Sequence, residues 1–196
     1  MSNPFIQSRN IGPMLQIVKG TPEYRAIADF YGQDRAKRSG VRLMNHIHEG
    51  VAVIACTGGG EDAVMAARAY CIHPLFQNDR ELATVGQEFA KKTWPSLLVL
   101  YAMEYREKAN AWLSDKVVKD EHGDLVCIGQ PDAGDDPVVR VMLCADKVQN
   151  YKDFIACHRG THTRSDELDL YFKTWLEHLG ISPELFEALC AAMEGV

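Results

Sequence analysis

Asp146 lies in a mostly apolar stretch of the chain, where a carboxylate needs a partner. It follows the run V-V-R-V-M-L-C-A at residues 138–145, and Lys147 and Asn150 come after it. The spacing of the apolar residues from Val138 onward predicts a helix with a buried stripe. Because an unpaired buried charge is expensive, we expect Asp146 to meet a metal ion, another cation or several hydrogen-bond donors. The structural alternative is that it lies at the helix edge or pairs with a nearby arginine.

Two histidines far upstream could complete a metal site with Asp146. His46 stands in L-M-N-H-I-H-E-G and His73 in A-Y-C-I-H-P-L-F-Q-N-D, both apolar surroundings at the beginning or end of an expected helix. Two imidazoles and a carboxylate suit Mn, Fe, Zn or a similar ion and leave coordination positions open for water and substrate. With seven histidines in the chain such a trio is easily found by chance. The residues alone therefore leave open whether they form one metal centre or lie in separate cores.

The composition of the chain bears on its domain number, its partners and its cellular compartment. Of 196 residues, 46% are hydrophobic and 24% charged, so we expect a single globular domain over residues 1–196. The net charge of −6 argues against extended nucleic acid or an anionic membrane as a partner. No segment is typical of a membrane span or a secretory signal. Six cysteines without a C-x-x-C pair indicate reduced thiols and a cytoplasmic protein.

Helical periodicity dominates the elements that would position these residues. Thr21 and Pro22 predict a helix start, by side-chain capping and a favoured first position. Further helices are expected at or near residues 45–57, 61–72, 79–92, 96–112, 138–150, 165–179 and from 183 onward. We expect the helix over 61–72 to end at His73-Pro74, because proline disfavours helical geometry at the residue before it.

Two segments differ from this helical pattern. Residues 1–20 show few periodic signals and could form an N-terminal arm. β-Branched flanks around E-H-G-D predict a small β-hairpin near residues 117–128. The fold class predicted from all these elements is an all-α bundle with that one small hairpin insertion.

Three motifs resemble those of HD-domain hydrolases of the RelA/SpoT type, which cleave (p)ppGpp. Residues 32–46, G-Q-D-R-A-K-R-S-G-V-R-L-M-N-H, resemble a first motif with a basic, nucleotide-contacting turn and a metal-binding histidine. Residues 69–79 resemble the second motif, in which a His-Asp pair precedes a catalytic Glu-Asp pair. Residues 144–150, C-A-D-K-V-Q-N, resemble the third motif, A-D-K-x-x-N, which carries the last metal-binding aspartate. Their order and separations agree over about residues 25–180, most of the chain.

The resemblance implies an HD-domain-like helical bundle whose divalent metal ion is held by the two histidines and Asp146. The chain departs from the family at Pro74, which stands in place of the aspartate of the His-Asp pair and so removes one ligand. Gln77 and Asn78 replace the catalytic Glu-Asp pair. The alternative is therefore a site that has lost its metal, with no cofactor, and has kept only the pocket.

The motifs and their surroundings provide candidates for catalysis and for substrate binding, and Glu49 or Asp79 could supply either a fourth metal ligand or the base. The catalytic candidates are Asp79, which is the nearest acid after the second motif, Glu49, and Gln77 in the position of the family's glutamate. The substrate-binding candidates are Arg35, Lys37, Arg38, Lys147 and Asn150. The three residues of the basic turn could clamp phosphates or could simply form a solvated turn.

The leading hypothesis is a metal-dependent phosphohydrolase acting on a nucleotide or a related phosphorylated small molecule, similar to the (p)ppGpp hydrolases. In it the metal would lower the pKa of a bound water, and Asp79 or Glu49 would accept the proton. The basic turn would neutralise charge on the phosphate. The alternative is a catalytically inactive HD-like protein that binds a nucleotide or a protein partner through the same cleft. A third hypothesis is a helical protein that only assembles into a homo-oligomer.

Overall fold

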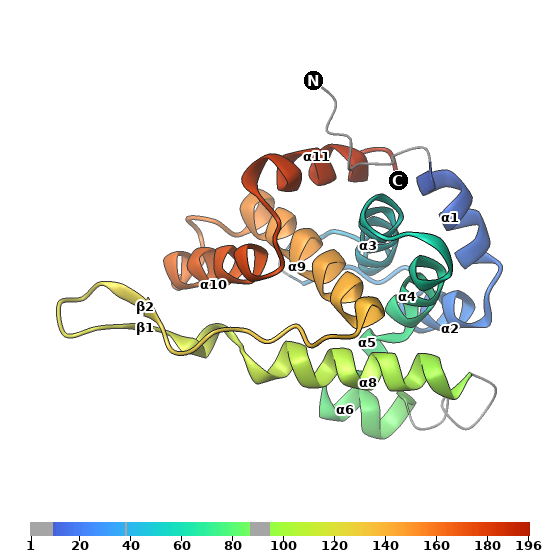
Figure 1. Cartoon of the computed structure of the whole chain (residues 1–196), viewed down its shortest axis with the longest axis horizontal. Helices are drawn as coiled ribbons and strands as arrows, with labels where there is room; N and C mark the ends of the chain where they lie inside the picture. Colours follow the sequence, from blue (N-terminus) through green and yellow to red (C-terminus); the bar gives the residue numbers. More distant parts are fainter. Residues whose placement is uncertain (1–9, 38, 87–94) are drawn as a thin grey trace.

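The computed structural model describes residues 10–37, 39–86 and 95–196. Within these residues, helix α9 (Pro137–Cys157) runs through the middle of the helical body (Figure 1). Helices α3, α4, α8, α10 and α11 all pack against α9. Asp136 caps the start of the helix, and its side chain accepts hydrogen bonds from the backbone N–H groups of Val138 and Val139. The predicted stripe is buried, and so is most of the remaining surface of α9. Asp146 therefore lies in the core on the central helix.

Helices α3 (Leu43–Thr57) and α4 (Gly60–Ile72) pack on α9 and on each other, and they carry the two histidine positions. The two helices approach closely at Gly50, where a Cβ atom would overlap with the ring of Tyr70. Helices α1 (Ile11–Lys19) and α2 (Pro22–Tyr31) cover the outer side of this pair. The start of α2 is as predicted, because the Thr21 side chain accepts a hydrogen bond from the Tyr24 backbone. Residues 11–19, within the segment described above as an arm, form α1.

The chain after α4 differs from the prediction in one local respect. Helix α4 ends at Ile72 as expected, but His73 keeps helical dihedral angles, with φ −55° and ψ −34°. Pro74 then occupies the first position of a second short helix, α5 (Pro74–Gln77), where proline is well tolerated. The prediction that proline would force His73 out of helical geometry is therefore wrong. His73 is held between two helical segments.

The segment expected to form a helix over 79–92 is shorter and less regular where the structure describes it. Helix α6 covers only Asp79–Glu81, and a π-helical turn follows at Leu82–Gly86. The remainder of the expected helix, residues 87–94, lies outside the described residues. Helix α8 (Ser96–Ala111) then packs on α4, α5 and α9.

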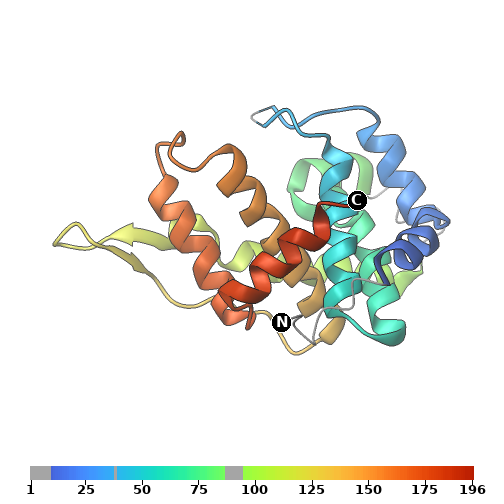
Figure 2. The same cartoon turned by 90° about the horizontal axis from the view of Figure 1, so that it is seen from above.

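A two-stranded antiparallel hairpin follows α8 and projects from the helical body in both views (Figures 1 and 2). Its strands are β1 (Val117–Lys119) and β2 (Leu125–Cys127), which confirms the predicted hairpin. Two tryptophans anchor its base: Trp112 Nε1–H donates to the Ile128 carbonyl oxygen (3.1 Å), and Trp175 Nε1–H donates to the Trp112 carbonyl oxygen (3.2 Å).

Helices α10 (Ser165–His178) and α11 (Pro183–Met193) complete the fold. Trp175 of α10 is fully buried, while α11 packs across α3 and α9. The architecture is all-α with one small hairpin, which confirms the predicted fold class. Among the described helices, none combines the length and the apolar character needed to cross a membrane.

Candidate metal centre

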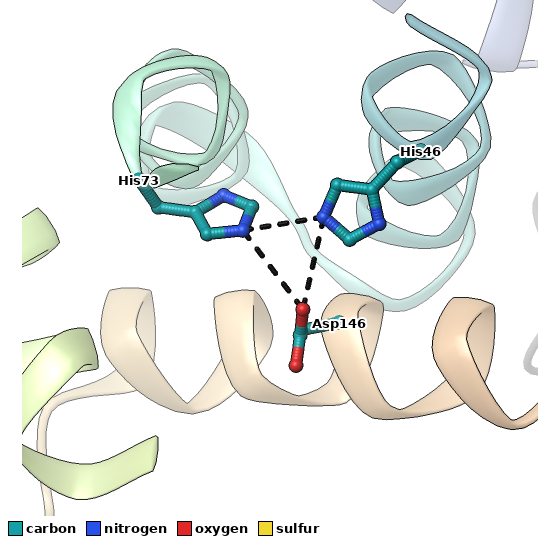
Figure 3. A group of neighbouring side chains, drawn as sticks. All are labelled: His46, His73 and Asp146. Atoms are coloured by element: carbon teal, nitrogen blue, oxygen red, sulfur yellow. Dashed lines mark hydrogen bonds and ion pairs between the residues drawn. The ribbon is translucent and has the colours of Figure 1, made fainter. Parts of the chain in front are cut away.

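His46, His73 and Asp146 point toward one another from three separate segments (Figure 3). His46 comes from α3, His73 from the junction of α4 and α5, and Asp146 from α9. The two Nε2 atoms lie 3.2 Å apart. Oδ1 of Asp146 lies 3.7 Å from Nε2 of His46 and 3.9 Å from Nε2 of His73. Packing of α3, α4 and α9 thus brings together three residues that are far apart in the sequence.

The outer nitrogen of each histidine is already used in a hydrogen bond. His46 Nδ1 lies 2.6 Å from Oε1 of Gln149, and His73 Nδ1 lies 2.6 Å from the backbone oxygen of Tyr70. Both partners are carbonyl oxygens, which only accept hydrogen bonds, so each Nδ1 must carry the proton. In a neutral imidazole the other nitrogen then has a free lone pair. The two lone pairs and the Asp146 carboxylate oxygen therefore face one another.

The geometry of these three atoms fits a divalent ion. From their separations, a point equidistant from all three lies about 2.1 Å from each atom. Zinc bonds to imidazole nitrogen and carboxylate oxygen measure about 2.0 to 2.2 Å. Metal-bound histidines also usually donate their second N–H to a carbonyl or carboxylate oxygen, as both histidines do. The group could therefore hold a metal ion with three protein ligands.

Asp146 is buried but not isolated. Its Oδ1 accepts a hydrogen bond from Asn150 Nδ2 (2.8 Å), and its Oδ2 lies 3.1 Å from Nζ of Lys147. Burial alone would raise the pKa of Asp146, but the positive charge of Lys147, followed by the two histidines, holds it below its ordinary value. Lys147 is buried too, and Asp146 outweighs that burial to raise the pKa of the ammonium group. Asp146 is therefore a carboxylate, and its Oδ1 faces the histidines.

His73 is the most enclosed of the three groups, with 2% of its surface exposed. Burial first, and then the charge of neighbouring His46, lowers the pKa of His73 to about 3. The imidazole is therefore neutral near pH 7, which is the form that binds a metal. Aromatic rings enclose it: Tyr70 lies 4.4 Å and Tyr105 4.8 Å away, between ring centroids. The Tyr105 hydroxyl is buried as well, and burial first, then the Asp146 carboxylate, raises its pKa.

The three side chains open onto a cavity of about 420 Å³. Four aromatic residues line it, Phe30 and Tyr31 from α2 and Tyr171 and Phe172 from α10. Its polar lining includes Gln77, Asn78, Glu81, Lys147 and Asn150. This volume and this mixture of aromatic and polar side chains suit a small organic ligand next to the candidate ion.

Of the predicted catalytic residues, Gln77 lines the cavity and the other two lie elsewhere. The Asp79 side chain is 93% exposed and pairs with Arg106. Glu49 is buried, and Lys152 Nζ donates to its Oε1 (2.7 Å). Gln149 lies between Glu49 and His46 and is hydrogen-bonded to both.

Of the predicted substrate-binding residues, Lys147 and Asn150 line the cavity. Arg35 is exposed and donates to the Gly40 backbone oxygen (2.7 Å), and Lys37 is exposed as well. Neither is among the described residues that line the cavity. The prediction for Arg38 falls outside the described residues.

Two further side chains at this site were not predicted from the sequence. Glu81 lines the cavity, and its Oε2 is buried with no hydrogen-bond partner among the described residues. Tyr31 lines the same cavity, and burial, then Glu81 and Asp146, raise its pKa. In the sequence, Glu81 stands three residues after Asn78, at the spacing of a helix-capping pair. Asn78 Oδ1 does accept a hydrogen bond from the backbone N–H of Glu81. The sequence pattern around Glu81 therefore indicates a helix start and gives no sign that its carboxylate lines a cavity.

The chain matches no family model, no curated protein and no solved structure. The helical fold with its His-His-Asp cluster is compatible with an HD-like fold.

Proposed function

We propose that this protein is a metal-dependent phosphohydrolase that acts on a nucleotide or a related phosphorylated small molecule. The observation that carries the proposal is the convergence of two imidazole lone pairs and the Asp146 carboxylate at the wall of a cavity. The resemblance of the three motifs to the RelA/SpoT-type hydrolases supports phosphate chemistry at this site.

In this proposal each group of side chains at the cavity has a separate role. His46, His73 and Asp146 hold the ion, which when bound activates water and polarises a phosphoryl oxygen. Lys147 holds the Asp146 carboxylate in its ionised form, and Asn150 orients it from the other side. The aromatic residues of α2 and α10 exclude water and pack against the planar part of the substrate.

For proton transfer we assign Glu81. Glu81 lines the cavity, and its Oε2 has no hydrogen-bond partner among the described residues, so this carboxylate can accept a proton from the attacking water and return it to the leaving oxygen. Asp79, the acid expected from the motif, is directed toward Arg106. The basic turn that contains Arg35 and Lys37 would then contact the substrate only if the substrate extends beyond the cavity.

The proposal is tested by metal content and phosphate release. The protein is stripped with a chelator, reloaded with Mn²⁺, Fe²⁺ or Zn²⁺, and incubated with nucleoside mono-, di-, tri- and tetraphosphates. We expect phosphate release that depends on the ion and disappears in Asp146→Asn. A protein that binds no ion, or that binds one and stays inert over the whole panel, would contradict the proposal.

One observation favours a second function, a non-catalytic binding protein. The ion pair between Lys147 and Asp146 gives the buried carboxylate a partner that needs no metal. Pro74 and Gln77 stand where the family carries a ligand and a catalytic acid. Calorimetry that detects nucleotide binding without turnover, with or without metal, would support this second function.

A further inference from the structure

Gln149 connects the candidate metal centre to a second, buried polar group. It lies three residues after Asp146 on α9 and is only 1% exposed. Its Oε1 accepts from Nδ1 of His46, while its Nε2 donates to Glu49 Oε2 (3.2 Å) and to Asp153 Oδ2 (2.8 Å). The hydrogen bonds of both ends of this amide are therefore satisfied within the protein.

The two carboxylates determine which way the amide of Gln149 points. A reversed amide would place its oxygen against Glu49 and Asp153, both of which only accept hydrogen bonds when ionised. Lys152 Nζ donates to Glu49 Oε1 (2.7 Å), so a cation lies beside this carboxylate. The amide oxygen must therefore face His46. An oxygen at that position requires the proton of His46 to be on Nδ1, which leaves the lone pair on Nε2.

We infer that Gln149 is a positioning residue that selects the tautomer and the ring orientation of His46, and through them the candidate metal centre. The inference rests on the proposed metal centre and adds the chain Lys152–Glu49–Gln149–His46 behind it. His73 differs, because its Nδ1 donates to a backbone oxygen that no substitution removes. The tautomer of His46 is thus the one that depends on a side chain.

Without Gln149 the preferred tautomer of His46 changes. The Nδ1–H group would lose its acceptor, whereas an Nε2–H group could donate to Nε2 of His73, 3.2 Å away. The Nε2–H form would therefore gain population, and it has no lone pair for a metal on the inner side. Substitution of such outer-sphere partners typically lowers metal affinity by about 10- to 100-fold.

The test compares the wild-type chain with Gln149→Met, which keeps a side chain of similar length but offers no strong acceptor. Long-range ¹H–¹⁵N NMR on the metal-free protein reads the tautomer of His46, and titration with Zn²⁺ reads the affinity. We expect Nδ1–H in the wild type, a gain of Nε2–H in the variant, and an affinity for Zn²⁺ lower by about 10- to 100-fold. His48→Gln is the matched control, since His48 lies on the same helix but pairs with the Tyr24 hydroxyl.

The outcomes separate this inference from the proposed function. An Nε2–H tautomer in the wild type, or an unchanged tautomer in Gln149→Met, overturns the inference even if the protein hydrolyses phosphates. A wild type that binds no Zn²⁺ removes the metal centre, while the tautomer comparison in the metal-free protein still tests the role of Gln149. If Gln149→Met does not fold, Gln149→Asn replaces it: the shorter side chain withdraws the amide oxygen from Nδ1 of His46 and should shift the tautomer in the same direction, and no shift would overturn the inference.

Discussion

The Nε2 atoms of His46 and His73 lie 3.2 Å apart, although each histidine donates its proton from Nδ1 to a different oxygen. Two lone pairs that face each other repel unless a cation or a donor lies between them. The Tyr70 hydroxyl, 3.2 Å from Nε2 of His46, can donate to one of them. A divalent ion at the point that both Nε2 atoms and Oδ1 of Asp146 face would replace that donor and satisfy all three atoms.

The pKa of His73 predicts a pH dependence of stability in the metal-free protein. An unfolded histidine has a pKa of about 6.5, while folding lowers that of His73 to about 3. Between these values the unfolded state binds more protons, so the free energy of unfolding falls as pH decreases, by up to about 1.4 kcal/mol per pH unit from this residue. Urea unfolding at a series of pH values, with a chelator present, measures this dependence. In His73→Gln the free energy of unfolding should change less with pH than in the wild type. The same slope in that variant as in the wild type would contradict the prediction. The exposed His122, replaced by Gln, is the control.

Gly50 is predicted to be required for the position of Tyr70. A Cβ atom at position 50 would overlap with Cε1, Cζ and the hydroxyl of the Tyr70 ring, which contacts His46. Gly50→Ala should therefore destabilise the fold by about 1–3 kcal/mol, as overpacked cores do, and also weaken Zn²⁺ binding. Thermal melting and metal titration measure the two effects. Gly12→Ala, where a Cβ meets nothing within 4 Å, is the matched control. Unchanged melting and Zn²⁺ titration in Gly50→Ala would show that Tyr70 can move at no cost.

Lys147 is predicted to balance the charge of Asp146 when no metal is present. Lys147→Met leaves a buried carboxylate without its cation, which typically costs about 3–5 kcal/mol. Added Zn²⁺ should restore part of that stability in the variant, because the ion replaces the missing charge. Lys173→Met, which removes the exposed lysine of a partly exposed pair with Asp169, should cost less than about 1 kcal/mol. Chemical unfolding with and without Zn²⁺ measures the free energy of unfolding of both variants. A Lys147→Met variant that Zn²⁺ does not stabilise would contradict the prediction.

Substitution of Glu81 is predicted to reduce kcat strongly, and substitution of Asp79 is predicted to reduce it little. If Glu81 transfers the proton, Glu81→Gln should reduce kcat by about 10²- to 10⁴-fold with little change in metal content. Asp79→Asn removes the ion pair with Arg106 on the exposed side of α6 and should affect kcat much less. The reverse order of the two variants would return the role to Asp79, the acid expected from the motif.

Much of the fold was predictable because local signals agree with tertiary packing. The capping residue Thr21, the periodicity of α9 and the β-branched flanks of the hairpin each correspond to the expected element. Pro74 was misread, because a proline that interrupts one helix can also begin the next.

The three candidate ligands were predictable from residue type and motif spacing, but their surroundings were not. The direction of Asp79 depends on Arg106 of α8, and the contact between Gln149 and His46 joins residues 103 positions apart. Such contacts depend on how helices pack, which periodicity within one helix does not determine. The cavity has the same origin, since α2, α5, α9 and α10 each contribute a part of its wall.

Anomalous diffraction from crystals grown with Zn²⁺ tests the central claim most directly. We expect one zinc peak at about 2.0–2.2 Å from Nε2 of His46, Nε2 of His73 and Oδ1 of Asp146, and its loss in Asp146→Asn. A fully ordered cluster without zinc, or zinc bound only elsewhere on the protein, would contradict the claim that these three residues form a metal centre.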